Sequence, residues 1–193
     1  ANESVKMANM DKCKKLLMDG LAKYPNNDNI IEGLINVYTA GAGDPKELIE
    51  VVDGALKRDP KNKGLWYGRG RIFYSLKDYD QSIESFKKVV ELDPKDAQSL
   101  YYVGYFYVLK ADGLNNEFNQ RDYKSNDEFK ADQAKIIAVY KEAIPYLEKS
   151  YEANPKNLST LEVLKSLTFR LREEDGIQAK FEKYNKLFNE AKK

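Results

Sequence analysis

The sequence predicts an all-α fold, a right-handed α-solenoid of helical hairpins of which one is elongated. The first observation is a recurring stop, in which a proline follows the end of an apolar segment at Pro25, Pro60, Pro94 and Pro155. The first two intervals are 35 and 34 residues long, and the last is 61 residues long. The second observation is that apolar residues between the stops recur at the helical spacing of three and four. A period of about 34 residues is typical of stacked helix–turn–helix units, each too small to bury its apolar stripe alone.

The composition of the 193-residue chain narrows the classes of function. Its 32 basic and 31 acidic residues give a net charge of +1, which argues against a nucleic-acid partner. No apolar run approaches the ~20 residues that span a bilayer, so no transmembrane segment is expected. The sequence has no histidine, one cysteine and no phosphate-binding glycine loop. We therefore expect a protein that is no enzyme, with no catalytic residue, no metal site and no cofactor.

Residues 1–28 are expected to hold part of a repeat. Cys13, Leu17 and Pro25 fall where the second helix of a hairpin would place them, whereas the first helix of that hairpin is mostly missing. Cys13 occupies a small-residue position on the apolar side of this helix, so we predict a buried, inert thiol. The array of repeats is therefore predicted to be cut at its N-terminal end.

Residues 29–62 are predicted to form the first full hairpin. Its internal turn has three residues of the types that start a helix. Asp44 is suited to cap the second helix, Pro45 to its first position and Glu47 to its first turn. We therefore predict that the second helix begins at Pro45.

Residues 63–96 show the repeat pattern most completely. The characteristic positions of the pattern are occupied by Trp66, Gly70, Phe73, Tyr79, Ser82, Phe86 and Pro94. This pattern resembles the tetratricopeptide repeat family, which implies a solenoid that binds other proteins. The sequence departs from the family pattern at Arg69, where the family has a leucine packed between helices. We expect either a looser contact there or an arginine whose charged end reaches solvent.

Residues 97–157 are expected to form a third hairpin with an insertion at about 111–137. The insertion is expected to be a polar segment at first and helical afterwards. Ser125 and Glu128 form a capping box, so a helix is predicted to start near Asn126. It should continue into the second helix of the repeat and exceed the usual length by about three turns.

The second helix of this elongated hairpin has two further features. Phe129, Ile136 and Tyr140 give it an apolar face that should pack on the neighbouring hairpin or on a partner. Pro145 falls inside the helix, and we predict a kink there because proline lacks the backbone donor. Residues 158–193 then form the last hairpin, whose final helix should end the solenoid as a cap. The apolar stripe of that helix consists of Ile177, Phe181, Tyr184 and Phe188.

The family resemblance implies a concave groove lined by the first helix of each hairpin. Its positions map onto Gly33, Val37, Tyr67, Arg71, Tyr74, Gln98, Tyr101, Tyr105, Val108, Glu162, Ser166 and Phe169. Six of these are predicted to bind the partner, namely Tyr67, Arg71, Tyr74, Gln98, Tyr101 and Tyr105. Tyrosine offers a large contact area with a polar end, and arginine can pair with a carboxylate, so we expect a peptide segment or partner helix. A receptor for chaperone C-terminal tails is not expected, because the positions that need lysine and asparagine hold Tyr67, Arg71, Gln98 and Tyr102.

Two alternatives stay open. One is self-association, or a structural role within a larger tetratricopeptide repeat protein, with the groove empty. The other is a helical module that binds a glycan or a small ligand, because aromatic rings also stack on sugars. The chain loosely resembles exported repeat proteins of Gram-negative bacterial envelopes, which implies a bacterial, periplasmic setting. The sequence itself names neither the compartment nor the partner.

Overall fold

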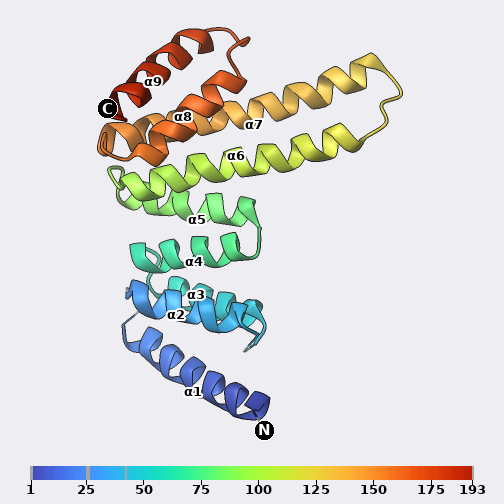
Figure 1. The fold of residues 1–193 in the computed structure, drawn as a ribbon. Coiled ribbons are helices and arrows are strands. Elements are labelled where there is room, and N and C mark those ends of the chain that lie inside the picture. The colour runs from blue at the N-terminus through green and yellow to red at the C-terminus, as the bar shows by residue number, and fades with distance from the viewer. Residues whose placement is uncertain (1, 25–26, 42, 193) are drawn as a thin grey trace. The chain divides into compact units, whose positions relative to one another are not determined.

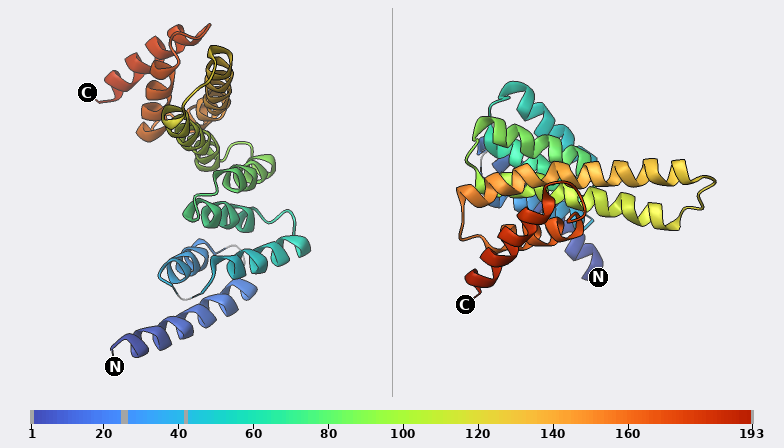
Figure 2. Two further views of the ribbon diagram at one scale, coloured as in Figure 1. Left: turned by 90° about the vertical axis from the view of Figure 1, so that its right-hand side faces the viewer. Right: turned by 90° about the horizontal axis from the view of Figure 1, so that it is seen from above.

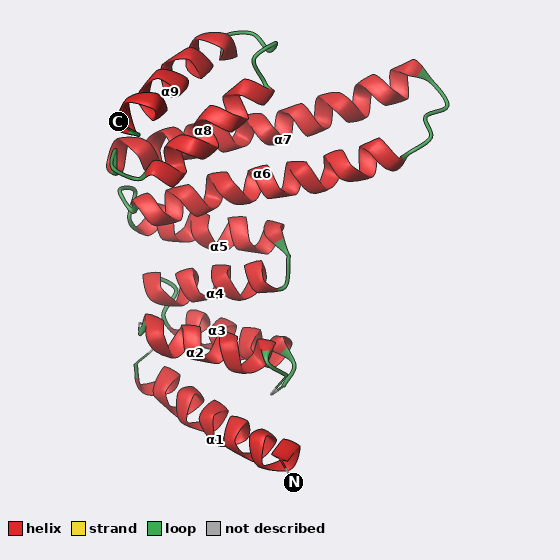
Figure 3. Cartoon of the chain, viewed as in Figure 1, coloured by secondary structure: helices red, strands yellow, loops and turns green. Residues whose placement is uncertain are grey.

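The computed structural model describes residues 2–24, 27–41 and 43–192. Over these residues it contains nine α-helices and no strand, which confirms the predicted all-α fold (Figure 1, Figure 3). The chain divides into two compact units, Ala1–Pro94 and Lys95–Lys193. None of the described helices is long and apolar enough to cross a membrane.

The first unit consists of five helices. They are α1 (Asn2–Lys23), α2 (Asp28–Thr39), α3 (Pro45–Arg58), α4 (Lys63–Ser75) and α5 (Tyr79–Leu92). Polar side chains satisfy the free backbone donors at the helix starts, as where Asp78 accepts from the N–H of Gln81. The turn predicted before α3 is confirmed, because Asp44 accepts from the N–H of Lys46 and Pro45 is the first helical residue.

Apolar residues of α1 to α4 form the core of this unit. The buried members are Leu21, Ile31, Leu34, Ile35, Tyr38, Leu48, Val52, Leu56, Leu65 and Ile72. Small residues bring α4 and α5 together, because a Cβ at Gly70 would lie 2.5 Å from the ring of Phe86. Ser82 is fully buried at the same contact and donates from Oγ to the Gly70 carbonyl at 2.9 Å. The small-residue positions of the repeat pattern thus set how closely these two helices pack.

Two predictions about the first unit are wrong. Cys13 is exposed rather than buried, although the spacing of four places it on the same side of α1 as Leu17 and Leu21, which pack into the core. At Arg69, the contact between the helices is not looser, and the charged end of the side chain does not reach solvent. Its side chain is only 12% exposed, and Nε donates to Asp53. A polar contact therefore replaces the apolar one that the family pattern has at this position.

The second unit contains the predicted elongated hairpin. Its helices are α6 (Ala97–Gln120), α7 (Asn126–Ala153), α8 (Leu158–Arg170) and α9 (Ile177–Ala191). α6 and α7 run antiparallel and side by side along their length (Figure 2). Ser125 Oγ accepts from the N–H of Glu128 at 3.2 Å, so α7 begins where it was predicted to begin. Pro145 lies inside α7 as predicted, and the kink at this residue stays a prediction.

The first part of the insertion is helical, which corrects the expectation of a polar segment outside the helices. α6 continues to Gln120, and only residues 121–125 connect the two helices. Ala111, Leu114 and Phe118 continue one apolar stripe along α6 and pack into the core of the second unit. This packing outweighs the low helix propensity of the glycine and asparagine residues between them.

Residues from all four helices form the core of the second unit. The buried members on α8 and α9 are Leu161, Leu164, Leu167, Ile177, Tyr184 and Phe188. Three of the four residues in the predicted stripe of the last helix are therefore buried, and Phe181 is half-buried. The hydroxyl of Tyr184 donates to Oε1 of Glu148 on α7 at 2.7 Å, which ties α9 to the hairpin.

Candidate functional site

Three of the predicted partner-binding residues, Tyr67, Arg71 and Tyr74, share one face of α4, because four and three residues separate them. The ring of Tyr67 meets Phe86 edge-on, with the ring centroids 5.3 Å apart. A terminal nitrogen of Arg71 lies 3.7 Å from Oε1 of Glu32 on α2, and Glu32 is 53% exposed. The side chain of Tyr74 is 43% exposed. This face of α4 therefore combines aromatic surface with a loosely paired guanidinium.

The other three, Gln98, Tyr101 and Tyr105, share one face of α6. The rings of Tyr101 and Tyr105 are stacked, with centroids 5.5 Å apart and planes 9° apart. Both tyrosines are half-buried, and Gln98 is exposed. A second stacked pair, Tyr102 and Phe106, lies beside the first, with centroids 5.5 Å apart. Stacking along the helix holds the tyrosines in fixed orientations.

Other groove positions differ in their surroundings. Gly33 on α2 lies against Leu17 of α1, whose side chain would be 3.0 Å from an added Cβ. Phe169 on α8 is 50% exposed, and its ring centroid lies 5.2 Å from that of Phe181. The guanidinium of Arg172 lies 4.3 Å from the centroid of the same Phe169 ring. Gly33 thus serves helix packing, whereas Phe169 adds an aromatic surface to α8.

The tip of the elongated hairpin holds an aromatic cluster that sequence reasoning missed. Phe118 near the end of α6, Tyr123 in the connecting loop and Phe129 near the start of α7 have ring centroids 4.8 to 5.3 Å apart. The interpretation of residues 111–125 as a polar segment hid this cluster. The spacing of four between Leu114 and Phe118 is the signal that points to it, because it continues an apolar helix face.

Charged side chains tie the loop at the tip to α7. Arg121 contacts both Glu128 and Asp132, and its Nη1 donates to Oδ2 of Asp132 at 2.7 Å. Lys135 donates to Oδ1 of Asp132 at 3.0 Å, and the Tyr123 hydroxyl lies 3.4 Å from Oδ2. The hydrogen bond from Lys135 is the main cause that lowers the pKa of Asp132, whereas burial raises the pKa of Tyr123. These contacts hold Asp132 ionised between two cations.

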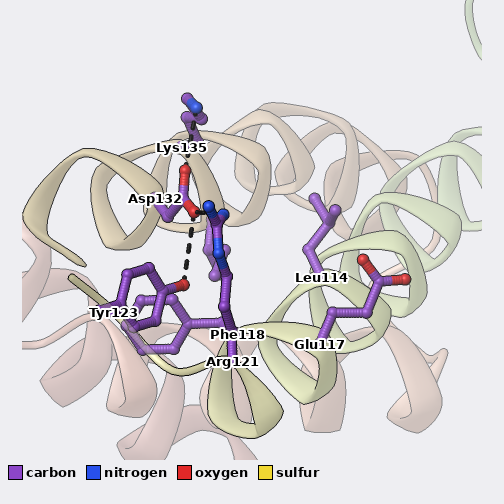
Figure 4. A pocket seen from close by; sticks show the side chains of 8 residues that line it. Leu114, Glu117, Phe118, Arg121, Tyr123, Asp132 and Lys135 are labelled. Atoms are coloured by element: carbon purple, nitrogen blue, oxygen red, sulfur yellow. Dashed lines mark hydrogen bonds and ion pairs between the residues drawn. The ribbon is translucent and has the colours of Figure 1, made fainter. Parts of the chain in front are cut away.

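A pocket of about 300 Å³, the hairpin pocket, lies beside these residues (Figure 4). Its apolar lining consists of Leu114, Phe118 and Ile136. Its polar lining consists of Glu117, Arg121, Tyr123, Asp132 and Lys135. Figure 4 shows Leu114 and Glu117 at one end of the pocket and Tyr123 at the other, with Arg121 between them. The pocket therefore joins an apolar surface to groups of both charges.

A second pocket, of about 280 Å³, shares Phe118 and Ile136 with the hairpin pocket and is also lined by residues of α8. Two of its lining residues, Tyr140 and Arg170, contact Asp112: the hydroxyl of Tyr140 donates to Oδ1 of Asp112 at 2.5 Å, and Arg170 of α8 donates to both Asp112 and Tyr140. Burial, with the hydrogen bond to Asp112, raises the pKa of Tyr140 to about 12. This cluster joins α8 to the elongated hairpin.

These surfaces consist of aromatic rings and of charged side chains that form ion pairs. In the part of the chain that the structure describes, no three side chains of the metal-ligating kinds gather into a possible metal site. The aromatic faces of α4 and α6 and the hairpin pocket are the candidate binding surfaces of the described chain.

Comparison with known proteins identifies the repeat. Residues 65–96 match the tetratricopeptide repeat family. The chain is 28% identical over 103 residues to interferon-induced protein with tetratricopeptide repeats 2 of Cricetulus griseus, covering 53% of this chain and 20% of that protein. It is 30% identical over 67 residues to Superkiller complex protein 3 of Homo sapiens, covering 35% of this chain and 4% of that protein. The chain thus spans a fifth or less of the length of these relatives.

Solved structures show the same type of fold. MamA is similar with a TM-score of 0.61 and 16% identity, over 98% of this chain and 92% of MamA. An IFIT1 monomeric mutant with Gppp-AAAA is similar with a TM-score of 0.60 and 15% identity, over 87% of this chain and 35% of that one. At these identities the likeness concerns the fold alone. It confirms the predicted fold class, a solenoid of helical hairpins.

Proposed function

Because the chain is a tetratricopeptide repeat protein, we propose that it is a non-catalytic interaction module that binds a peptide segment or a helix of a protein partner. The observation that carries the proposal is the stacked pair of Tyr101 and Tyr105 beside the exposed Gln98 on one face of α6. Rings that are already fixed by stacking lose little side-chain entropy when a partner covers them. Their hydroxyls and the amide of Gln98 supply hydrogen bonds along the same face.

The face of α4 supports the same function in the first unit. Arg71 is paired with Glu32 at 3.7 Å, a distance at which the ion pair contributes little. A carboxylate of the partner is therefore able to take the place of Glu32 without a large loss. Tyr67 and Tyr74 lie one turn to either side of Arg71 and supply aromatic contact area. We propose that these residues bind an acidic or aromatic part of the partner.

The experiment uses affinity capture and then direct binding. The full chain captures partners from a native lysate with crosslinking, and the segment that crosslinks is synthesised and titrated by calorimetry. Tyr101→Ala with Tyr105→Ala is expected to weaken binding about tenfold or more, because tyrosine anchors dominate such interfaces. Arg71→Ala is expected to weaken it less and to reduce its dependence on salt.

The matched control is Tyr24→Ala with Tyr151→Ala, since both tyrosines lie outside the faces of α4 and α6. This control should bind as the unchanged chain does, and circular dichroism should show equal helix content for all variants. Equal affinity of the α6 variant and the control would overturn the proposal. Because the IFIT1 structure contains Gppp-AAAA, capped RNA is titrated in parallel, and we expect no binding from a chain of net charge +1.

A further inference from the structure

The hairpin pocket belongs to the part of the chain that ordinary repeats lack. α6 has 24 residues and α7 has 28, whereas α4 has 13 and α5 has 14. All residues that line the pocket fall between 114 and 136, within the insertion. The pocket is therefore separate from the helix faces to which partner binding was assigned above.

The apolar part of the pocket suits the stem of one side chain. Leu114 and Phe118 of α6 and Ile136 of α7 line it, and Phe118 is held by its contacts with Tyr123 and Phe129. A volume of about 300 Å³ is at the lower end for ligand sites, so it admits one long side chain rather than a large ligand. The surface is preformed, because the aromatic cluster fixes one wall.

The charges around the pocket do not balance. Arg121 and Lys135 are paired with Glu128 and Asp132, which makes two cations for two anions. Glu117 is exposed and makes no hydrogen bond or ion pair with the described part of the chain. One carboxylate therefore stands unpaired beside an apolar surface. A carboxylate in this position favours a cation that arrives on an apolar stem.

We propose that the hairpin pocket binds a lysine or arginine side chain from a basic segment of a protein partner. The methylene stem packs on Leu114, Phe118 and Ile136, and the charged end pairs with Glu117. The guanidinium of Arg121 stays over the ring of Tyr123, 5.2 Å from the ring centroid. Tyr123 thereby closes the other end of the pocket. The elongated hairpin is then a second binding arm, which acts whether or not the faces of α4 and α6 bind a partner.

The test is a two-dimensional NMR titration, in which three amino-acid derivatives with capped ends are added to the full chain. The probes are Nα-acetyl-arginine N-methylamide, the corresponding lysine compound and the uncharged citrulline compound. Amide signals of residues 114–121 and 132–136 are expected to shift with the two cationic probes. The citrulline probe is expected to bind about three- to tenfold more weakly, because it has the same shape without the charge.

Glu117→Gln is expected to remove the preference for the cationic probes. The matched control is Glu142→Gln, which removes the same charge from an exposed residue of α7 outside the pocket and should keep the preference. Equal binding of citrulline and arginine probes, or an unchanged preference in Glu117→Gln, would overturn the proposal. Tighter binding of free arginine than of its blocked form would also overturn it, since the pocket would then be a site for a free amino acid.

Discussion

Arg69 on α4 donates from Nε to Oδ1 of Asp53 on α3 across 2.8 Å. Its terminal nitrogens donate to Oγ of Ser85 at 2.7 Å and to Oε1 of Gln81 at 2.9 Å, both on α5. The guanidinium also lies over the ring of Phe73, 4.6 Å from the centroid. One arginine thus joins three helices at a position where the repeat pattern has leucine. The hydrogen bonds account for a charged residue that is almost wholly covered.

Arg69→Ala is expected to lower the free energy of unfolding by about 2–4 kcal/mol, because it leaves a void and unpaired polar groups. Arg69→Leu should cost less, because it fills the space with the residue of the repeat pattern. Urea unfolding followed by circular dichroism measures both. Arg71→Ala is the control and should cost less than about 1 kcal/mol, because its ion pair is long and partly exposed. Equal costs for Arg69→Ala and Arg71→Ala would contradict the structural role of Arg69.

Gly70→Ala and Gly54→Ala are expected to change stability in opposite directions. A Cβ at Gly70 would lie 2.5 Å from the buried ring of Phe86, so overpacking should cost about 1–3 kcal/mol. A Cβ at Gly54 on α3 would meet nothing within 4 Å, so alanine should stabilise that helix by about 0.5–1 kcal/mol. Melting temperatures of the two variants provide the measurement. The same sign for both would show that α4 and α5 are not as close as the structure has them.

Short-range patterns in the sequence predicted the helices well. The features that these patterns missed depend on contacts between residues that are far apart in the sequence. The start of α7 at Asn126 follows from a cap within four residues, and the start of α3 from Asp44 and Pro45. The helical end of α6 depends instead on the packing of Phe118 against residues that follow the loop. The contacts of Arg69 depend likewise on α3 and α5, which no pattern within α4 describes.

The candidate sites differ in the same respect: a short-range pattern predicts the face of α6, whereas packing between two helices forms the hairpin pocket. The repeat period alone assigns Tyr101 and Tyr105 to one face of a helix, because the spacing of four does so in any helix. The period says nothing about the hairpin pocket, which depends on how the two long helices meet. No sequence pattern distinguishes Glu117 from the other charged residues, whereas the ion pairs of its neighbours in the structure do.

Tyr140→Phe is expected to reduce the loss of stability at alkaline pH. Folding raises the pKa of Tyr140 from 10.0 to about 12, so the neutral form is favoured in the folded chain. That contribution is fully present below pH 10 and is lost as the pH rises from 10 through 12. Urea midpoints of both proteins between pH 8 and pH 11.5 measure the slope. The pKa of Tyr184 is also raised, mainly by burial, so the slope should fall without vanishing. Parallel slopes would contradict the prediction.

Phe118→Ala is expected to loosen the tip of the elongated hairpin without unfolding the first unit. Phe118 contacts both Tyr123 and Phe129, and its loss leaves the connecting loop without its apolar support. Trypsin should then cut faster after Arg121 and Lys124, as followed by mass spectrometry. Phe129→Ala is the matched control, since the Phe129 side chain is already 37% exposed and its removal opens a smaller void. The cut should be several times faster in Phe118→Ala than in Phe129→Ala, because opening of the loop depends on the lost packing energy. Equal rates would mean that the ion pairs of Arg121, rather than the aromatic cluster, hold the loop.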